Sequence, residues 1–122
     1  MEKEFVPYEL AVKLKELGFD EPCFVYYKRS NENKPAYPNH GVIQNSICGN
    51  GITAPTFSQA FRWFREDLTC DSWIRPNLVI DGPKIYQFLI NDKLDDEWYE
   101  TYEEAELACL TKLIEIVELK SE

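Results

Sequence analysis

Histidine and closely spaced cysteine are what this sequence lacks most. Its 122 residues include one histidine, His40, and four widely separated cysteines with no Cys-x-x-Cys pair. Structural zinc sites use such close ligand pairs, so we expect no metal site and no other cofactor. We interpret the cysteines as reduced thiols, with Cys23 and Cys109 serving as small apolar core residues.

Positive charge and long apolar runs are also scarce. There are 13 Lys and Arg against 22 Asp and Glu, which gives a formal net charge of −9. This balance disfavours sequence-independent binding to nucleic acid or to an anionic membrane, because both depend on basic side chains that neutralise phosphates. The longest apolar runs are far too short to cross a bilayer, and Met1–Glu4 has no apolar signal region. We therefore expect a cytoplasmic protein with no membrane partner.

The composition favours one folded domain over residues 1–122. Hydrophobic residues make up 44% of the chain and aromatic residues 14%. A chain of this length buries a core without needing disulfides or metals to hold it together.

The first half of the chain predicts a helix followed by strands and a long loop. Leucines at helical spacing predict a helix over Pro7–Leu17, with Gly18 as its C-terminal cap. The aromatic and β-branched content of Cys23–Lys28 predicts a strand. Turn residues predict a loop over Arg29–Gly41, and Gly41–Ser46 is interpreted as a short strand.

The second half predicts a helix, a three-strand meander and a final helix. Apolar spacing indicates a helix over Ala54–Leu68. Asn77–Asp81 and Ile85–Asn91 are expected to pair as a hairpin, and Glu97–Glu100 to add a third strand. Because proline lacks an N–H group, Pro76 places the start of the first of these strands at a sheet edge or an irregular entry.

The C-terminal helix is predicted to be the main wall of the core. Thr101 and Glu104 have the spacing of a capping box, which places the first helical residue at Tyr102. Apolar residues then occupy a broad arc of the helix at 100° per residue: Tyr102, Ala105, Cys109, Leu110, Leu113, Ile114, Ile116 and Val117.

This order of elements predicts the α+β class. We expect three helices and one mostly antiparallel sheet of four to five strands. Both faces of Cys23–Lys28 and of Ile85–Ile90 carry large apolar groups, so a two-layer arrangement and a helix–sheet–helix sandwich both remain open.

Three segments carry a resemblance that covers most of the chain. FVPYELAVKLKELGFDEPCF (5–24), APTFSQAFRWFRE (54–66) and YETYEEAELACL (99–110) resemble short uncharacterised proteins of Bacteroides-type bacteria, their phages and integrated elements. The last segment, a strand followed by Thr-x-Glu-Glu-Ala and a helix, is also similar to phage helix–sheet–helix sandwich domains. The resemblance implies a mobile-element context and carries no activity or functional residues with it.

The densest charge feature is an acidic stretch before and within the start of the last helix. It comprises Asp92, Asp95, Asp96, Glu97, Glu100, Glu103, Glu104 and Glu106. Such a stretch could bind a basic protein, mimic a nucleic-acid backbone or collect a divalent cation. The simpler interpretation is a solvated turn and a helix N-terminus, where the helix dipole favours negative charge, and it accounts for most of these residues without a partner. We take Asp95, Asp96, Glu97, Glu100, Glu103 and Glu104 as the candidate interaction surface.

Other candidate sites carry less weight. Trp63 falls off the apolar stripe of its predicted helix, which makes it the best candidate for an aromatic interface anchor. His40 and Cys48 would give a thiol with a nearby base, but both lie in predicted loops without a known catalytic signature. The neighbouring carboxylates Asp95 and Asp96 lack the apolar setting that splits the pKa values of a catalytic pair.

These observations favour a non-catalytic, protein-binding accessory factor of phage or mobile-element type. A homodimer is compatible with the same surface. The alternatives are a nucleic-acid-linked accessory factor, which would need a continuous basic groove, and an unrecognised enzyme, which would need a deep pocket with convergent polar groups.

Overall fold

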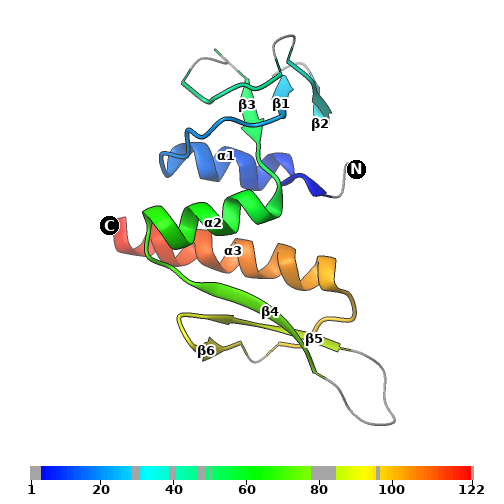
Figure 1. The fold of residues 1–122 in the computed structure, drawn as a ribbon, viewed down its shortest axis with the longest axis vertical. Helices are drawn as coiled ribbons and strands as arrows, with labels where there is room; N and C mark the ends of the chain where they lie inside the picture. The colour runs from blue at the N-terminus through cyan, green and yellow to red at the C-terminus, as the bar shows by residue number, and fades with distance from the viewer. Residues whose placement is uncertain are drawn as a thin grey trace. The chain divides into compact units, whose positions relative to one another are not determined.

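The structure, a computed structural model, describes residues 4–28, 31–38, 41–46, 49, 51–77, 85–95 and 97–121. These residues form three α-helices and two antiparallel sheets of three strands each (Figure 1). The chain divides into two compact units, Met1–Ala60 and Phe61–Glu122. The predicted α+β class with antiparallel pairing is confirmed. The prediction of one sheet of four to five strands is wrong, because the strands separate into two smaller sheets.

The elements follow one another in a mixed order. They are α1 (Tyr8–Glu16), β1 (Val25–Lys28), β2 (Asn31–Ala36), β3 (Ile52–Ala54), α2 (Phe57–Asp67), β4 (Ser72–Asn77), β5 (Ile85–Ile90), β6 (Lys93–Leu94) and α3 (Tyr102–Ser121). One sheet has the strand order β2-β1-β3 and the other β4-β5-β6.

Helix α1 ends in a Schellman motif at the predicted glycine. The N–H of Phe19 donates to the carbonyl of Leu14 at 3.0 Å, and the N–H of Gly18 donates to the carbonyl of Lys15 at 3.1 Å. Gly18 has a φ of +101°, a conformation that side chains with a Cβ rarely adopt. Phe19 and Leu14 are both buried, which supplies the hydrophobic contact that accompanies this motif.

Gly18→Ala should lower the free energy of unfolding by about 1–2 kcal/mol, the cost of a Cβ in a left-handed backbone. A Cβ added at Gly18 would have no atom within 4 Å, so the cost comes from the backbone alone. Gly18→Asn should lose less, since asparagine tolerates positive φ better than alanine. Urea unfolding of the two variants checks this order, and equal losses would contradict the conformational explanation.

The first sheet corrects two predictions. The predicted loop over Arg29–Gly41 contains strand β2, which pairs with β1 through an irregular register. Asparagine and proline suggested a loop there, but β2 lies at the sheet edge, where a proline such as Pro35 is tolerated. The predicted strand Gly41–Ser46 is reduced to a single bridge between Ile43 and Cys23. The other neighbour of β1 is β3, which the sequence did not indicate.

A buried asparagine joins three segments of the first unit. The side-chain amide of Asn45 donates to the carbonyl of Phe19 at 2.8 Å, and its carbonyl oxygen accepts from the N–H of Thr53 at 2.9 Å. The N-terminal segment is tied down nearby, because the hydroxyl of Tyr27 donates to the carbonyl of Val6 at 2.9 Å. Backbone N–H and C=O groups in this core are thus hydrogen-bonded to side chains as well as to neighbouring strands.

Helix α2 begins later than predicted. Thr56 is its N-cap, and the Thr56 hydroxyl oxygen accepts from the N–H of Gln59 at 3.1 Å. Ala54 belongs to β3, where it pairs with Val25. The placement of Trp63 off the buried stripe is wrong: its side chain is 4% exposed and packs edge-on against Phe64 with ring centroids 5.2 Å apart.

The second sheet confirms the central strand of the meander and shifts its neighbours. Strand β5 lies where it was predicted, but its partner β4 precedes the predicted strand Asn77–Asp81; residues 78–84 lie outside the described residues. Pro76 lies on β4, an edge strand, as its missing N–H requires. Asn91 and Asp92 have φ values of 50° and 69°, and they link β5 to β6 in the manner of a two-residue type I′ turn.

Helix α3 begins at Tyr102, as predicted from the capping pattern. The Thr101 hydroxyl oxygen accepts from the N–H of Glu104 at 3.1 Å. The helix packs on β5 and β4. Its centre is fully buried, with Ala105, Cys109, Leu110, Leu113 and Ile114 on the inner side, whereas Tyr102 is exposed. The predicted third strand Glu97–Glu100 is reduced to one bridge, in which Tyr99 and Tyr86 exchange both backbone hydrogen bonds.

Candidate functional site

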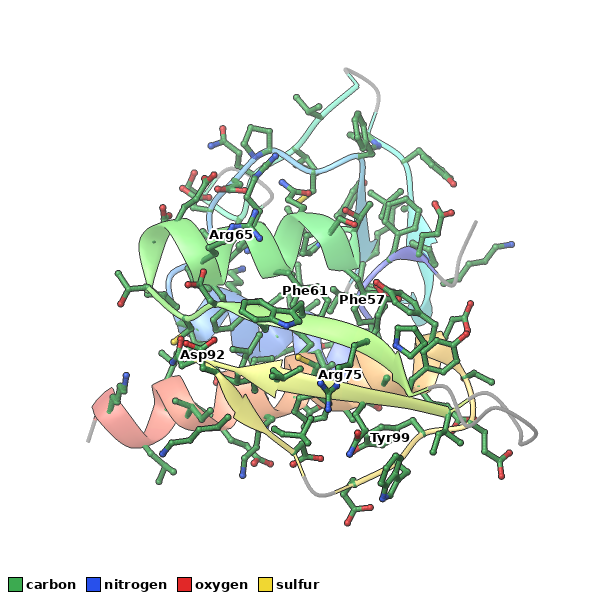
Figure 2. The ribbon with its side chains drawn as sticks, turned by 60° about the horizontal axis from the view of Figure 1, so that its bottom comes forward. Phe57, Phe61, Arg65, Arg75, Asp92 and Tyr99 are labelled. Carbon is green, nitrogen blue, oxygen red and sulfur yellow. The ribbon has the colours of Figure 1, made fainter. Side chains whose placement is uncertain are left out.

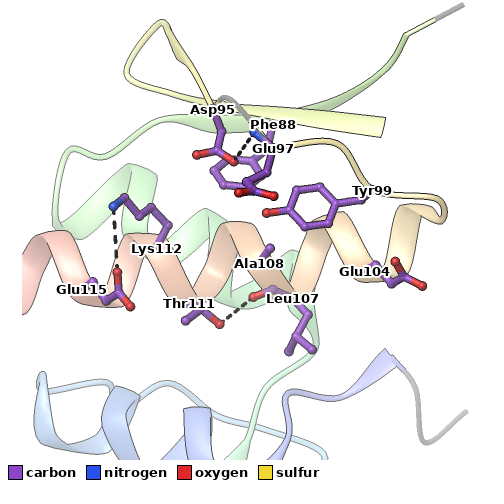
Figure 3. A pocket seen from close by; sticks show the side chains of 10 residues that line it. All are labelled: Phe88, Asp95, Glu97, Tyr99, Glu104, Leu107, Ala108, Thr111, Lys112 and Glu115. Carbon is purple, nitrogen blue, oxygen red and sulfur yellow. Dashed lines mark hydrogen bonds and ion pairs between the residues drawn. The ribbon is translucent and has the colours of Figure 1, made fainter. Parts of the chain in front are cut away.

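Two adjoining hollows lie between α3 and the end of the second sheet. The first has a volume of about 500 Å³ and the second about 430 Å³. Both are lined by Phe88, Asp95 and Lys112, so they form one elongated depression, which we name the α3 groove. Figure 3 shows its first part, with Asp95, Glu97 and Tyr99 on the sheet side and Leu107 and Lys112 on the helix.

The floor of the α3 groove is apolar. Phe88 projects from β5, and the ring of Tyr99 stacks on it with centroids 6.0 Å apart and planes 24° apart. The bridge between Tyr99 and Tyr86 holds the chain so that this stacking is possible. Leu107 and Ala108 complete the floor from α3. A floor of this kind can receive a large apolar side chain of another molecule.

One end of the α3 groove is acidic. Glu97 and Glu104 line the first hollow only, and Asp95 lines both hollows. The backbone N–H of Asp95 donates to the carbonyl of Phe88 at 3.0 Å, and the N–H of Glu97 donates to the Asp95 carboxylate at 3.2 Å. Glu104 occupies the first turn of α3, where the helix dipole favours its charge. Three acidic side chains are therefore positioned by backbone that is itself hydrogen-bonded.

The other end of the α3 groove is basic. Lys93 and Lys120 line the second hollow only, whereas Lys112 lines both hollows. Lys112 also lies 4.0 Å from the carboxylate of Glu115, in an exposed pair that contributes little to stability. The groove thus carries opposite charges at its two ends.

Two groups, Tyr99 in the lining of the α3 groove and Cys109 in the buried part of α3, have raised pKa values. Burial is the main cause that raises the pKa of Tyr99, and the negative charges of Asp95 and Glu97 raise it further. Burial also raises the pKa of the Cys109 thiol to about 12, against the opposing effect of a hydrogen bond with Ser72. The nucleophilic form of a cysteine is the thiolate, so Cys109 has no nucleophile to offer at neutral pH.

Glu106 supplies a pH-dependent test of this electrostatic description. Burial, followed by the charge of Glu103, raises the pKa of Glu106 above its ordinary value of 4.5. The folded state therefore holds this proton more tightly than the unfolded state, and the group lowers stability once the pH is high enough to ionise it in both states.

Glu106→Gln should consequently raise the free energy of unfolding at neutral pH by about 0.2–0.5 kcal/mol, the usual scale of a like-charge pair on a helix. The gain should disappear as the pH falls below the ordinary pKa of a glutamate. Urea unfolding at several pH values measures it. Glu115→Gln, which removes a carboxylate near Lys112, is the matched control and should bring no gain.

The candidate residues from the sequence divide into four groups. Asp95, Glu97 and Glu104 come together at the α3 groove, whereas Glu100 and Glu103 are exposed and do not line it. Asp96 lies outside the described residues, as do His40 and Cys48. Trp63 is buried in α2, apart from the acidic residues in the sequence and absent from the lining of the α3 groove.

Sequence reasoning missed the apolar and basic parts of the α3 groove. Leu107 is exposed and lies off the buried arc of α3, which is the one signal that could have marked it. Lys112 gave no signal of its own. Among the described residues, no three His, Cys, Asp or Glu side chains come close enough to hold a metal ion. No described helix has the length and apolar character needed to span a membrane.

The negative charge of the chain is concentrated in the unit that contains the α3 groove. Fifteen acidic and seven basic residues give Phe61–Glu122 a formal net charge of −8, whereas seven acidic and six basic residues give Met1–Ala60 a net charge of −1. Comparison with models of protein families, with curated proteins and with solved structures finds no match.

Proposed function

We propose that the protein is a non-catalytic, protein-binding accessory factor and that the α3 groove is its contact surface. The observation that carries this proposal is the combination of an apolar floor with an acidic end, in a unit with a formal net charge of −8. The raised pKa values of Tyr99 and Cys109 support a binding role rather than a catalytic one, because neither group is activated.

The chemistry of the α3 groove defines the segment that it would bind. A large apolar side chain of the partner would lie on Tyr99, Leu107 and Ala108, above the buried Phe88. Lysine or arginine residues on one side of that anchor would face Asp95, Glu97 and Glu104. An acidic residue on the other side would face Lys93 and Lys120. Opposite charges at the two ends would fix the direction in which the segment binds.

The biological setting forms part of the same proposal. The resemblance of residues 5–24, 54–66 and 99–110 to short proteins of Bacteroides-type bacteria and their phages supports an accessory role in a phage or mobile element, acting in the cytoplasm. The similarity of the last segment to phage helix–sheet–helix sandwich domains is consistent with this setting. A basic partner protein also suits the net negative charge, whereas a nucleic acid would be repelled by it.

A displayed library of random 12-residue peptides tests the proposal. Peptides selected by the protein should combine a large apolar residue with lysine or arginine. Their affinity should fall at least about tenfold, equivalent to about 1.4 kcal/mol, in Glu97→Lys/Glu104→Lys. Leu107→Ala should weaken the same peptides through the loss of the floor.

The matched control is Glu66→Lys/Asp67→Lys. These residues are exposed on α2, and the double substitution changes the net charge by the same amount without touching the lining of the α3 groove. It should leave the selected peptides bound. Equal losses in both double variants would show that only net charge matters, and a library that yields no basic peptides would overturn the proposal. Binding of single-stranded oligonucleotides in place of peptides would favour the nucleic-acid alternative.

A further inference from the structure

The face of the second sheet that points away from α3 carries an apolar row. Ile74 and Phe88 are directly opposite each other, and Phe88 contributes to the floor beside α3. Because side chains alternate along a strand, Trp73 and Leu89, also directly opposite, point to the other face. Leu94 is opposite Leu89 in the register between β5 and β6, but it lines the second hollow beside α3 and is not counted here. Trp73 and Leu89 thus form an apolar row across two strands.

The β4 side of this apolar row is open to solvent. Trp73 is 50% exposed, whereas Leu89 is half-buried and Gln87, opposite Arg75 on the same face, is buried. A half-exposed tryptophan beside a leucine is the kind of anchor that protein interfaces use. Figure 2 views the sheet from this side, with Arg75 in front of the strands.

Two opposite charges flank the tryptophan on the same strand. Asp71 precedes Trp73 by two residues and Arg75 follows it by two, so the alternation along the strand points all three side chains to the same face. Asp71 lies in line with the strand, because its carbonyl accepts from the N–H of Asn91 at 2.8 Å. Both charged side chains are exposed. Along β4, this face therefore presents an acidic residue, a tryptophan and a basic residue in that order.

We propose that this face binds a second copy of the chain, with Trp73 on the two-fold axis. A two-fold axis along the apolar row turns the second copy so that its β4 runs antiparallel to the first. Trp73 then meets Trp73 of the second copy, and Asp71 meets Arg75 of the second copy in two equivalent pairs. This is the self-complementary contact that a symmetric dimer requires.

The geometry of packed sheets allows these contacts. Sheets that pack face to face are roughly 10 Å apart with nearly aligned strands. An arginine side chain reaching from one sheet meets an aspartate from the other across that distance, while the apolar row fills the centre. The charges of Asp71 and Arg75 cancel within one copy, so this face does not select the basic segment proposed for the α3 groove. The dimer is thus independent of the proposed function.

Charge exchange tests the pairing. Asp71→Arg places two basic residues on the face, and Arg75→Asp places two acidic residues there. Each variant alone should be monomeric at concentrations where the unchanged protein dimerises, because like charges meet across the axis. An equimolar mixture of the two variants should recover the dimer as a heterodimer, and so should the double variant Asp71→Arg/Arg75→Asp. Sedimentation equilibrium across micromolar to millimolar concentrations measures these masses.

Two tryptophan variants complete the experiment. Trp73→Ala should be monomeric, whereas Trp98→Ala, which removes a tryptophan of similar exposure at 52%, should still dimerise. Far-ultraviolet circular dichroism verifies that each variant is folded. A monomeric unchanged protein at all concentrations would overturn the proposal. A dimer that survives either single charge change, or that the mixture fails to restore, would also overturn it.

Discussion

Leu113→Ala should lower the free energy of unfolding by about 2–5 kcal/mol, the range for truncating a buried leucine that leaves a cavity. Leu113 is fully buried at the centre of α3, the helix that packs on β5 and β4. A loss of this size is a large share of the stability of a small domain, so the second unit should be unfolded or nearly so at moderate temperature. The substitution tests the role of α3 as the wall of that core.

Leu119→Ala provides the matched control for Leu113→Ala. It is the same substitution on the same helix, but the side chain of Leu119 is 72% exposed, and its loss should change stability by less than about 0.5 kcal/mol. Trp63, Trp73 and Trp98 all lie between Phe61 and Glu122, so tryptophan fluorescence during urea unfolding follows this unit alone. Equal losses at the two leucines would mean that α3 does not cover the sheet.

Phe19→Ala should lower the stability of the first unit by about 3–5 kcal/mol, the range for truncating a buried phenylalanine. Phe19 is 1% exposed and follows the glycine that ends α1. Its carbonyl accepts from the buried amide of Asn45, so a collapse at this point disturbs a hydrogen bond as well as the packing. The predicted effect therefore belongs to the upper part of the range for large-to-small substitutions.

Phe24→Ala is the corresponding control. Phe24 is 61% exposed and lies five residues away in the same segment, so its removal should cost less than about 0.5 kcal/mol. No tryptophan lies in this unit, so amide hydrogen exchange is the suitable measurement. The N–H groups of Val6 and Cys23, which donate to Pro55 and Ile43, should exchange faster in Phe19→Ala and at an unchanged rate in Phe24→Ala. Unchanged protection in both would contradict the burial of Phe19.

Features that depend on neighbouring residues were predictable from the sequence. The start of α3 follows from Thr101 and Glu104, and the end of α1 follows from Gly18, because a cap satisfies backbone groups within one turn. Pairings between distant segments were not predictable in the same way. Strand β3 consists of three residues whose partner β1 lies more than twenty positions earlier, and β2 contains residues that usually form loops.

The candidate site shows the same difference between features set by neighbouring residues and features set by distant segments. The acidic end of the α3 groove came from a cluster of charges that is visible in the sequence. Its floor did not, because the stacking of Tyr99 on Phe88 depends on a bridge that returns the chain to β5 after an irregular segment. The burial of Trp63 was also missed, since the spacing of the phenylalanines in α2 indicated a different face and only tertiary packing decides which side is covered.

The two sheets also differ in the length of chain that each must close before it can form. Strands β5 and β6 are joined by Asn91 and Asp92 alone, a hairpin of the kind that forms within about 1–10 μs. In the first unit, by contrast, Val25 pairs with Ala54, and the N–H of Val6 donates to the carbonyl of Pro55. Closing such long loops costs entropy before any contact is gained, and this slows folding. We therefore expect the hairpin of β5 and β6 to form early, while the N-terminal segment stays exposed to proteases until residue 55 has been synthesised.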